Sequence, residues 1–481
     1  MDAIEYHQRT KHFPEFVRHD TYRLNWAIQP NPFKDYVGLQ SVPLPSPTMP
    51  TGYPATLAVT ERPAEARVLD APEVSRLLNL AAGVSRIYEL PGGEQIFFRT
   101  YACAGALYPI EVYLACGGEV EGLSPGLYHF HPLESALRQL RTDDPRPYLA
   151  RATGLRRSVA TSPVSMILTG IPWRTTWKYR ARGYRHLYWD SGMILANMLA
   201  LAASGGHPAE VLLGFDDQEL NLLVGVDGDR EMAICVVPVG LAGPGTAPVE
   251  PSGEPPQRIP HRAVPLSEAE VSYPEIGAVH QKSSLAAPEA AGNWSRSHER
   301  PPNTTLRDLC SESSIEGVIL RRGSKRAFKH SPIPLDQLEG IIDHATYRLS
   351  CDWGGPLIQV ALIANAVEGL EPGAYTYAHG FELVSSGKLR DKARFLCLDQ
   401  PLGGDAAATL FLLADLNATL RALGDRGYRA AQLEAGIIAG RVYLAAYACG
   451  LGATGLTFYD DEVRAFFQTE AEPMMTVAIG R

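Results

Sequence analysis

The chain carries the same motifs twice, and this internal duplication limits what it can fold into. VEGLSPGLY at 120–128 returns as VEGLEPGAY at 367–375, and Arg-Gly-Tyr-Arg occurs at 182–185 and again at 426–429. The two copies are separated by about half the chain, which is far more than the units that stack in solenoids. The sequence therefore predicts two related whole domains within 481 residues.

Each copy of Arg-Gly-Tyr-Arg is followed by a long apolar stretch of helical character, LYWDSGMILANMLALAAS and AAQLEAGIIAGRVYLAAYACG. Asp190 matches Glu434 in these stretches, and Gly192 matches Gly436. A helix that is apolar on all sides is usually buried. The small residues allow close packing, so we expect the two helices to pack against each other.

Several segments rich in β-branched and aromatic residues predict strands. They are 110–116, 126–130, 165–170 and 232–240 in the first half, and 357–364, 373–378, 409–414 and 475–480 in the second. Each half is therefore predicted to be an α+β domain with a mostly antiparallel sheet and flanking helices. The repeated VEGL motif is expected to be a β-hairpin with Pro-Gly at its turn.

Residues from about 243 to 303 are rich in Pro, Ser, Gly and Ala, which indicates a linker or wrapping segment. The predicted organisation is a first domain at 1–242, a linker at 243–303 and a second, divergent domain at 304–481.

Composition excludes some classes of function. The formal net charge of −9 argues against nucleic acid or an anionic membrane as a partner held by bulk electrostatics. Seven scattered cysteines without a C-x-x-C pair are typical of a reducing cytoplasm, and no membrane span or signal peptide is apparent. We therefore expect a cytoplasmic protein. His129 and His131 share a strand face, but no third ligand has suitable spacing, so no metal site is predicted.

Four segments of the first half resemble a known family: RTYACAGALYPIEVYL (99–114), VEGLSPGLYHF (120–130), WKYRARGYRHLYWDSG (177–192) and FDDQELNLLVGVD (215–227). They are similar to SagB-type azoline dehydrogenases, a branch of the FMN-dependent nitroreductase superfamily. The second half resembles the same superfamily through RRGSKRAF (321–328), DRGYRAAQLEAG (425–436) and ACGLGATGLTFYDDEV (448–463). Nitroreductases are intertwined homodimers with flavin sites at the subunit interface. The resemblance therefore implies two fused nitroreductase-like domains that form an intramolecular pseudo-dimer.

The resemblance also implies residues that hold the phosphate of FMN, which needs cations or helix N-termini. Arg321, Arg322, Ser324 and Arg326 match the family's R-x-S-x-R phosphate motif, and we expect them to open a helical region. Arg481 follows the last strand, where relatives place another phosphate-binding basic residue. The alternatives are a solvated basic helix start and an exposed chain end.

A second group of residues matches positions that border the flavin ring in the family. Arg99, Ala102, Cys103, Ala104 and Gly105 lie in a segment that resembles a Ser-Ala-Gly-Ala-Leu-Tyr-Pro stretch, where small residues let the backbone approach the ring. Cys103 stands where the family has serine. A thiol is a poor hydrogen-bond donor, so Cys103 is expected only to pack, and a nucleophilic role is the alternative.

Thr454 and Gly455 lie in GLGATG (450–455), which looks like a dinucleotide fingerprint but follows a predicted helix instead of a strand. In the family this segment brings backbone N–H groups to flavin N5. The resemblance therefore assigns both residues to cofactor binding.

Lys178 and Tyr179 match a Lys-Tyr pair that is implicated in proton abstraction in azoline dehydrogenases. Aromatising an azoline removes a carbon-bound proton and a hydride, so a base must face the flavin. The second half has Leu423 and Gly424 at the matching positions, and the first half begins with YHQRTK (6–11) instead of a phosphate motif. We therefore expect one complete FMN site, with its phosphate motif from the second half and its base from the first.

The expected function is FMN-dependent dehydrogenation of azoline heterocycles to azoles on a modified peptide. One alternative is an NAD(P)H-dependent reductase of nitro, quinone or enone groups. Another is a flavin-free scaffold subunit of a peptide-modifying complex. The expected partners are a peptide or small heterocyclic substrate and other enzymes of such a complex.

Overall fold

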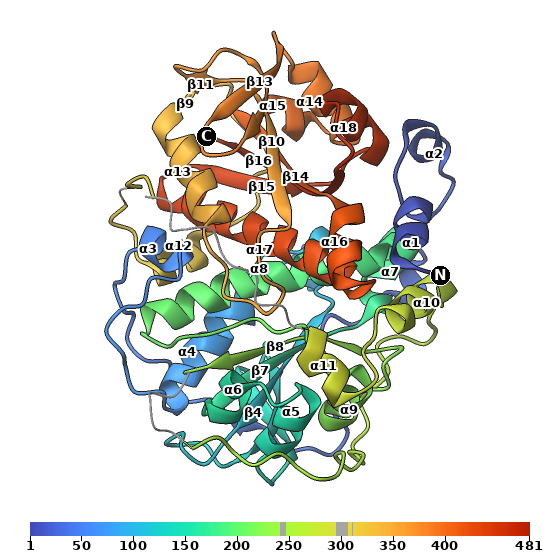
Figure 1. The fold of residues 1–481 in the computed structure, drawn as a ribbon, viewed down its shortest axis with the longest axis vertical. Helices are drawn as coiled ribbons and strands as arrows, with labels where there is room; N and C mark the ends of the chain where they lie inside the picture. Colours follow the sequence, from blue (N-terminus) through green and yellow to red (C-terminus); the bar gives the residue numbers. More distant parts are fainter. Residues whose placement is uncertain (241–246, 295–305, 310) are drawn as a thin grey trace.

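The computed structural model describes residues 1–240, 247–294, 306–309 and 311–481. Two lobes lie at opposite ends of the molecule, each built around a six-stranded sheet, and two long helices run between them (Figure 1). The predicted α+β class, with two similar domains joined as an intramolecular pseudo-dimer, is confirmed. The boundaries at 242 and 303 stay a prediction.

The two sheets share five strands in the same order, and each has a sixth strand, at opposite edges. The strands of the first are β1 (Val42–Pro43), β4 (Ile110–Cys116), β5 (Gly126–His131), β6 (Ala136–Arg141), β7 (Val164–Gly170) and β8 (Met232–Val239). Those of the second are β10 (Ile358–Ala364), β12 (Gly373–Tyr377), β13 (Phe381–Ser386), β14 (Ala408–Ala414), β15 (Gly452–Leu456) and β16 (Glu472–Gly480). The order is β1-β6-β5-β4-β7-β8 in one and β13-β12-β10-β14-β16-β15 in the other. All strand pairs in both sheets are antiparallel.

Helices flank the sheets, and two small ribbons complete the fold. The ribbons are β2 (Val84–Glu89) with β3 (Gln95–Arg99), and β9 (Ile333–Pro334) with β11 (Val367–Glu368). Up to residue 294 the α-helices are α1 (Ala3–Arg9), α2 (Pro14–His19), α3 (Ala55–Val59), α4 (Ala71–Ala82), α5 (Arg146–Ala152), α6 (Arg157–Thr161), α7 (Pro172–Tyr179), α8 (Gly183–Ser204), α9 (Asp217–Val224), α10 (Pro274–Lys282) and α11 (Pro288–Trp294). Later ones are α12 (Ile315–Arg321), α13 (Leu335–Thr346), α14 (Arg390–Leu396), α15 (Pro401–Asp405), α16 (Leu416–Leu423), α17 (Arg426–Ala448) and α18 (Asp460–Phe467). Short 3₁₀ turns are η1 (Trp26–Ile28), η2 (Ala104–Ala106) and η3 (Arg180–Arg182).

Helices α8 and α17 pack against each other in the centre, as predicted (Figure 1). A Cβ atom on Gly192 would lie 2.4 Å from the carbonyl carbon of Gly436, and one on Gly436 would lie 2.7 Å from the carbonyl oxygen of Trp189. Only glycine permits this approach. Both helices are buried almost throughout, which explains their apolar sequences. In the part of the chain that the structure describes, no helix has the length and apolar character needed to span a bilayer.

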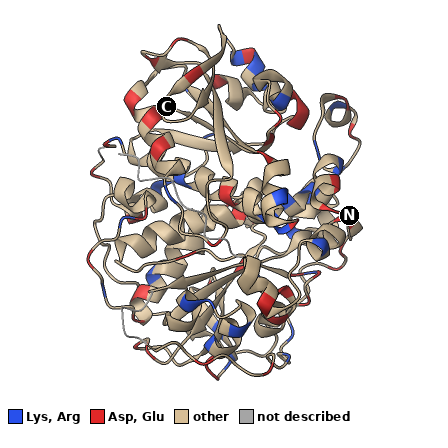
Figure 2. Ribbon diagram, in the orientation of Figure 1, with Lys and Arg blue, Asp and Glu red and all other residues tan. Residues whose placement is uncertain are grey.

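The arginines of the repeated Arg-Gly-Tyr-Arg motif join the lobes reciprocally. They form buried ion pairs with a carboxylate of the opposite lobe, at N–O distances of 2.6 to 2.9 Å. The pairs are Arg182 and Arg185 with Asp460, and Arg426 and Arg429 with Asp217. Elsewhere, Lys and Arg are interspersed with Asp and Glu over both lobes (Figure 2).

Two sequence expectations differ from the structure. The first VEGL motif does not form both strands of a hairpin: it lies in the loop that joins the antiparallel strands β4 and β5, and its Pro-Gly step is at the start of β5 instead of at the turn. The segment 243–303 was expected to be a linker or wrapping segment, and its described part contains the helices α10 and α11. Helix α10 packs on the central helices through His280, whose ring contacts Tyr184, and this tertiary contact stabilises a segment of weak local pattern.

Candidate functional site

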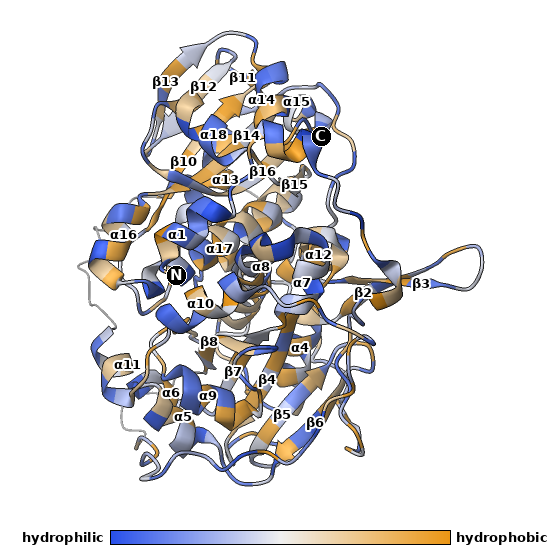
Figure 3. Ribbon diagram, turned by 90° about the vertical axis from the view of Figure 1, so that its right-hand side faces the viewer, coloured by the Kyte–Doolittle hydropathy of each residue, from blue (hydrophilic) through white to orange (hydrophobic). Residues whose placement is uncertain are grey.

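The flavin-edge loop, which we define as residues 99–109, connects the projecting β2–β3 ribbon to β4 (Figure 3). Gly105 has a φ of 67°, and Ala106 and Tyr108 have φ values of 53° and 49°. Residues with side chains rarely adopt a positive φ, and such strain gathers at functional sites. The surrounding structure must therefore hold this loop in place.

Asp190 of α8 supplies part of that support. Its carboxylate accepts hydrogen bonds from the Ala104 backbone N–H at 3.2 Å and from the Cys103 thiol at 3.1 Å, while the Cys103 sulfur accepts one from the Tyr108 N–H at 3.1 Å. Burial raises the pKa of Asp190 to about 7. Burial and then the Asp190 charge raise the pKa of the Cys103 thiol, which disfavours a nucleophilic thiolate. Cys103 is thus hydrogen-bonded in addition to being packed.

Lys178 and Tyr179, in the last turn of α7, lie against this loop. A Cβ atom on Gly105 would be 2.9 Å from the Tyr179 hydroxyl and 3.2 Å from Lys178 Nζ. The Tyr179 ring stacks on His186 with ring centroids 4.2 Å apart, and Lys178 is exposed. Burial raises the pKa of Tyr179, so its hydroxyl stays protonated at neutral pH. The structure therefore brings this Lys-Tyr pair to the flavin-edge loop.

On the second lobe, Arg322 and Ser324 follow α12, so the prediction that their cluster opens a helix is wrong. The backbone becomes extended at Arg322, and Ser324 pairs with β15. The Ser324 hydroxyl lies 3.1 Å from the Tyr443 hydroxyl oxygen, which also accepts a hydrogen bond from the Gly455 N–H at 2.6 Å. Thr454 is buried beside it, while Gly455 is exposed. Tyr443 of α17 thus joins Ser324 to the β15 backbone.

The remaining basic residues of the predicted phosphate motif differ in their exposure and in their hydrogen bonds. Arg326 and Arg481 are exposed, and the Arg481 carbonyl accepts a hydrogen bond from the Lys329 N–H at 2.8 Å, which keeps the last residue beside this segment. Arg321 instead donates to the carbonyl of Tyr447 at 3.4 Å. We call Arg322, Ser324, Arg326 and Arg481 the phosphate clamp.

The clamp and the flavin-edge loop meet across the lobe interface. Arg322 Nη2 donates to the Arg99 carbonyl at 3.2 Å, and the Arg99 guanidinium lies over the Tyr108 ring at 5.0 Å. The Nε atoms of Arg99 and Arg322 are buried and have no hydrogen-bond partner among the described residues. Buried donors of this kind suit a bound anion. Ala102 and Ala104, close by in sequence, are partly exposed, and their small side chains leave room for a flat ring.

The corresponding place on the other side of the interface is closed by the chain itself. Residues 350–352 precede β10 by the same distance as 102–104 precede β4. Here the Val211 N–H donates to the Ser350 carbonyl at 2.9 Å, and the Asp352 N–H donates to the Val211 carbonyl at 3.2 Å. The Asp352 carboxylate accepts two further backbone N–H groups from the segment after Val211. These direct contacts occupy the space between the two segments.

For two parts of the site, the structure also corrects which residues of the other lobe correspond to them. Helix α7 ends at Tyr179 and α16 ends at Leu423, so Ala422 and Leu423 match the Lys-Tyr pair, and Gly424 matches Arg180. Ala422 in the second lobe therefore corresponds to Lys178 in the first, and the corresponding pair in the second lobe contains no base.

In the first lobe, the segment that corresponds to the phosphate clamp is residues 60–67, and not residues 6–11 as the sequence suggested. The starts of α3 and α12 pair with each other, since the Ala55 N–H donates to the Ser313 carbonyl at 2.9 Å, so the segments that follow these helices correspond. Residues 6–11 belong to α1 and its end, where Lys11 forms an ion pair with Glu472.

Sequence reasoning missed Asp190 and Tyr443. A carboxylate inside an apolar helix must find a partner, and the match between Asp190 and Glu434 was visible in the sequence. Glu434 supports the corresponding loop, because it accepts hydrogen bonds from the Trp353 indole and the Leu357 N–H, both at 2.8 Å. Tyr443 offered no such signal, since tyrosine is common in buried helices.

One acidic and histidine cluster was not expected. Asp35, His131 and Glu134 bring potential ligand atoms within 4.8 Å of one another. His131 faces Asp35 with Nε2 at 3.1 Å and Glu134 with Nδ1 at 3.8 Å. Opposite ring nitrogens face the two carboxylates, and Nδ1 also accepts a hydrogen bond from the Glu134 backbone N–H at 3.3 Å. His129 is buried, 2.8 Å from Glu111.

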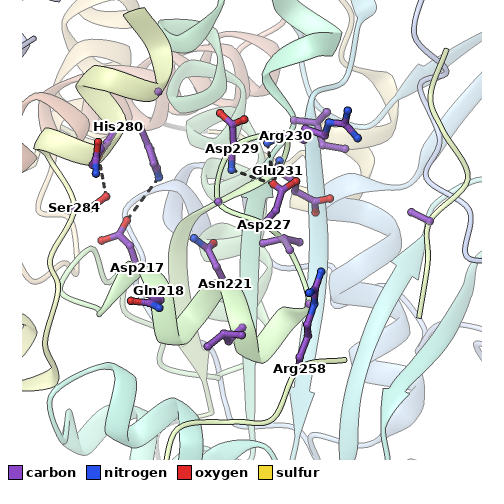
Figure 4. Close-up of a pocket in the computed structure, with 18 of the residues that line it drawn as sticks. Asp217, Gln218, Asn221, Asp227, Asp229, Arg230, Glu231, Arg258, His280 and Ser284 are labelled. Atoms are coloured by element: carbon purple, nitrogen blue, oxygen red, sulfur yellow. Dashed lines mark hydrogen bonds and ion pairs between the residues drawn. The ribbon is translucent and has the colours of Figure 1, made fainter. Parts of the chain in front are cut away.

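A separate cavity of about 1150 Å³ lies in the first lobe between α9, the turn at 225–231 and α10 (Figure 4). Asp217 and Asn221 line one side, and His280 and Ser284 line another. Asp217 is already committed to the buried ion pairs between the lobes. None of the predicted site residues lines this cavity.

Comparisons with known proteins agree with this architecture. The profile of the nitroreductase family matches residues 60–241 and 319–481, once in each lobe. The chain is 29% identical over 183 residues to MJ1384 of Methanocaldococcus jannaschii, which is named as a nitroreductase, with 35% of this chain and 92% of that protein covered. It is also 29% identical over 143 residues to McbC of Escherichia coli, named as a microcin B17-processing protein, with 29% and 52% covered. The chain thus spans about half the length of McbC.

A crystal structure from Anabaena variabilis, described as that of a nitroreductase, matches the entire fold. Its TM-score is 0.80 at 28% identity, and the match covers 100% of this chain and 99% of that one. Two lobes with antiparallel sheets, matched over the entire chain, define an oxidoreductase of the nitroreductase fold. The chain belongs to the nitroreductase family, whose members generally bind a flavin.

Proposed function

We propose that this protein is an FMN-dependent oxidoreductase that dehydrogenates azoline heterocycles to azoles on a modified peptide. The observation that carries the proposal is the contact of Lys178 and Tyr179 with Gly105, in the loop whose first residue, Arg99, is reached by Arg322 of the other lobe. The similarity to McbC, named for microcin B17 processing, supports a peptide substrate.

The phosphate clamp would hold the FMN phosphate, because its arginines and the Ser324 hydroxyl supply positive charge and a hydrogen-bond donor. The β15 backbone at Thr454 and Gly455 would border the ring, while the Gly455 N–H is donated to the Tyr443 hydroxyl. When bound, FMN supplies a two-electron acceptor for hydride. The direct bonding of Val211 to residues 350–352 supports a single cofactor per chain.

The Lys-Tyr pair would carry the proton chemistry. Conversion of an azoline to an azole breaks one C–H bond with loss of a proton and another with loss of a hydride, and one double bond forms. Lys178 would accept the carbon-bound proton, while the protonated Tyr179 hydroxyl donates a hydrogen bond to the heterocycle. The stacking of Tyr179 on His186 fixes the direction of that hydroxyl.

The test begins with the absorbance spectrum of the purified protein and mass spectrometry of the released cofactor. We expect FMN. Lys178→Ala and Tyr179→Phe are expected to keep the flavin and lower the oxidation of a thiazoline peptide by about 10²–10⁴-fold. Lys282→Ala, an exposed lysine at the end of α10, is the matched control and retains full activity.

Other outcomes would select the alternatives. Wild-type oxidation rates in both variants would refute the role of the Lys-Tyr pair and favour a nitro, quinone or enone reductase. Absence of flavin after expression with riboflavin would favour a scaffold subunit of a peptide-modifying complex.

A further inference from the structure

Arg180 directly follows the Lys-Tyr pair and has an unusual backbone conformation. Its φ and ψ are 51° and −144°, a region that favours glycine. The matching residue after α16 is Gly424, with φ and ψ of 64° and −167°. The fold therefore uses the same backbone shape at both positions, although the first lobe has an arginine there.

The side chain of Arg180 is held by an N-terminal segment, residues 13–28, which we call the strap. The guanidinium forms an ion pair with Asp20 and lies over the rings of Phe16 and Tyr22, at 5.1 and 5.0 Å from their centroids. An ion pair combined with two cation–π contacts restricts a long side chain that would otherwise move freely. A Cβ atom on Gly424, by contrast, would have no atom within 4 Å.

The strap also holds the residue that precedes the Lys-Tyr pair. The Tyr22 hydroxyl donates to the Trp177 carbonyl at 2.7 Å, and the Trp177 indole N–H donates to the Asn25 carbonyl at 2.8 Å. Trp26 packs edge-on against Trp177 with ring centroids 5.1 Å apart. The chain is thus fixed immediately before Lys178 and immediately after Tyr179.

We propose that Arg180 is a positioning residue that, through the strap, holds Lys178 and Tyr179 against Gly105. The strap contacts offset the unfavourable backbone conformation, and without them the end of α7 would relax and carry the Tyr179 hydroxyl away from the flavin-edge loop. The inference rests on the proposed function for the role of the pair, while the positioning itself is a statement about the structure.

The first test compares Arg180→Ala with Arg180→Lys in the flavin-loaded full chain. Arg180→Ala is expected to lower kcat for azoline oxidation by about 10- to 100-fold, since displacement of a reacting group by about 1 Å has that effect, with KM and flavin content unchanged. Arg180→Lys keeps a positive charge near Asp20 and the rings and is expected to restore most of the rate. Arg421→Ala, an exposed arginine in the last turn of α16, is the matched control.

The second test is independent of catalysis. Hydrogen exchange of the backbone amides at 177–183, measured by mass spectrometry, is expected to accelerate in Arg180→Ala and Asp20→Ala but not in Arg421→Ala. Unchanged exchange in both Arg180→Ala and Asp20→Ala, or a kcat of Arg180→Ala equal to wild type, would overturn the positioning role. If the wild-type protein fails to oxidise azolines, the proposed function has failed, and the exchange measurement still decides whether Arg180 holds the end of α7.

Discussion

Substitution of Gly105 by alanine tests the contact between the flavin-edge loop and the Lys-Tyr pair. At a φ of 67°, alanine costs about 1–2 kcal/mol of stability whatever its surroundings. The new Cβ would lie 2.9 Å from the Tyr179 hydroxyl, against 3.4 Å or more in ordinary contacts, so that hydroxyl must move by about 0.5 Å. Because His186 stacks on the Tyr179 ring, the movement displaces the ring as well.

The expected result is a small loss of stability and a large loss of activity. We expect kcat for oxidation of a thiazoline peptide, followed as loss of two hydrogen atoms by mass spectrometry, to fall by about 10- to 100-fold. Gly93→Ala is the matched control, because Gly93 has a φ of 86° and no atom within 4 Å of the new Cβ. Urea unfolding should show similar losses for both variants. Equal activity in the two variants would refute the reasoning.

Three further predictions address the cofactor, the buried carboxylate and the helix crossing. The protein is expected to bind one FMN per chain, measured by absorbance and protein assay, and a ratio near two flavins per chain would contradict this. Arg326→Ala should abolish flavin binding, whereas Arg67→Ala, in the corresponding segment of the first lobe, should not. Because burial raises the folded-state pKa of Asp190 to about 7, against about 3.9 unfolded, its contribution to stability should fall by up to about 4 kcal/mol as the pH rises from 4 to 7. Asp190→Asn should flatten that part of the pH dependence of unfolding, and an unchanged slope would count against the raised pKa. Gly192→Ala should destabilise the protein by at least about 1–3 kcal/mol, because its Cβ would meet backbone atoms of α17 at 2.4 Å. The control is Gly253→Ala, whose Cβ meets no atom within 4 Å; equal melting temperatures of the two variants would disprove the contact.

The sequence predicted the large elements well for a physical reason. The strands at 110–116 and 409–414 are buried along their whole length and consist of residues that favour strands, so local pattern and tertiary environment agree. The same holds for α8 and α17. The position of Arg322 was predicted less well, because its extended backbone is set by the pairing of Ser324 with β15, which the local sequence does not reveal.

Contacts between the lobes were the least predictable part of the site. Nothing in the neighbourhood of Arg322 indicates that it reaches the Arg99 carbonyl, since that contact joins residues far apart in the chain. The closure at Val211 was also hidden, because Val211 gives no sign that its N–H and carbonyl bond to residues 350–352 instead of leaving room for a ligand. Resemblance to a family identified the residues, but the structure was needed to show which of them meet.

The crossing of α8 and α17 has a consequence for how such a protein can change. In a dimer of identical chains, any substitution at the crossing would appear on both helices at once. Here Gly192 and Gly436 are encoded separately, so either side of the interface can be altered while the other is kept. Protein engineering can use this independence, because a substitution near Val211 and Asp352 leaves the residues at the Lys-Tyr pair untouched.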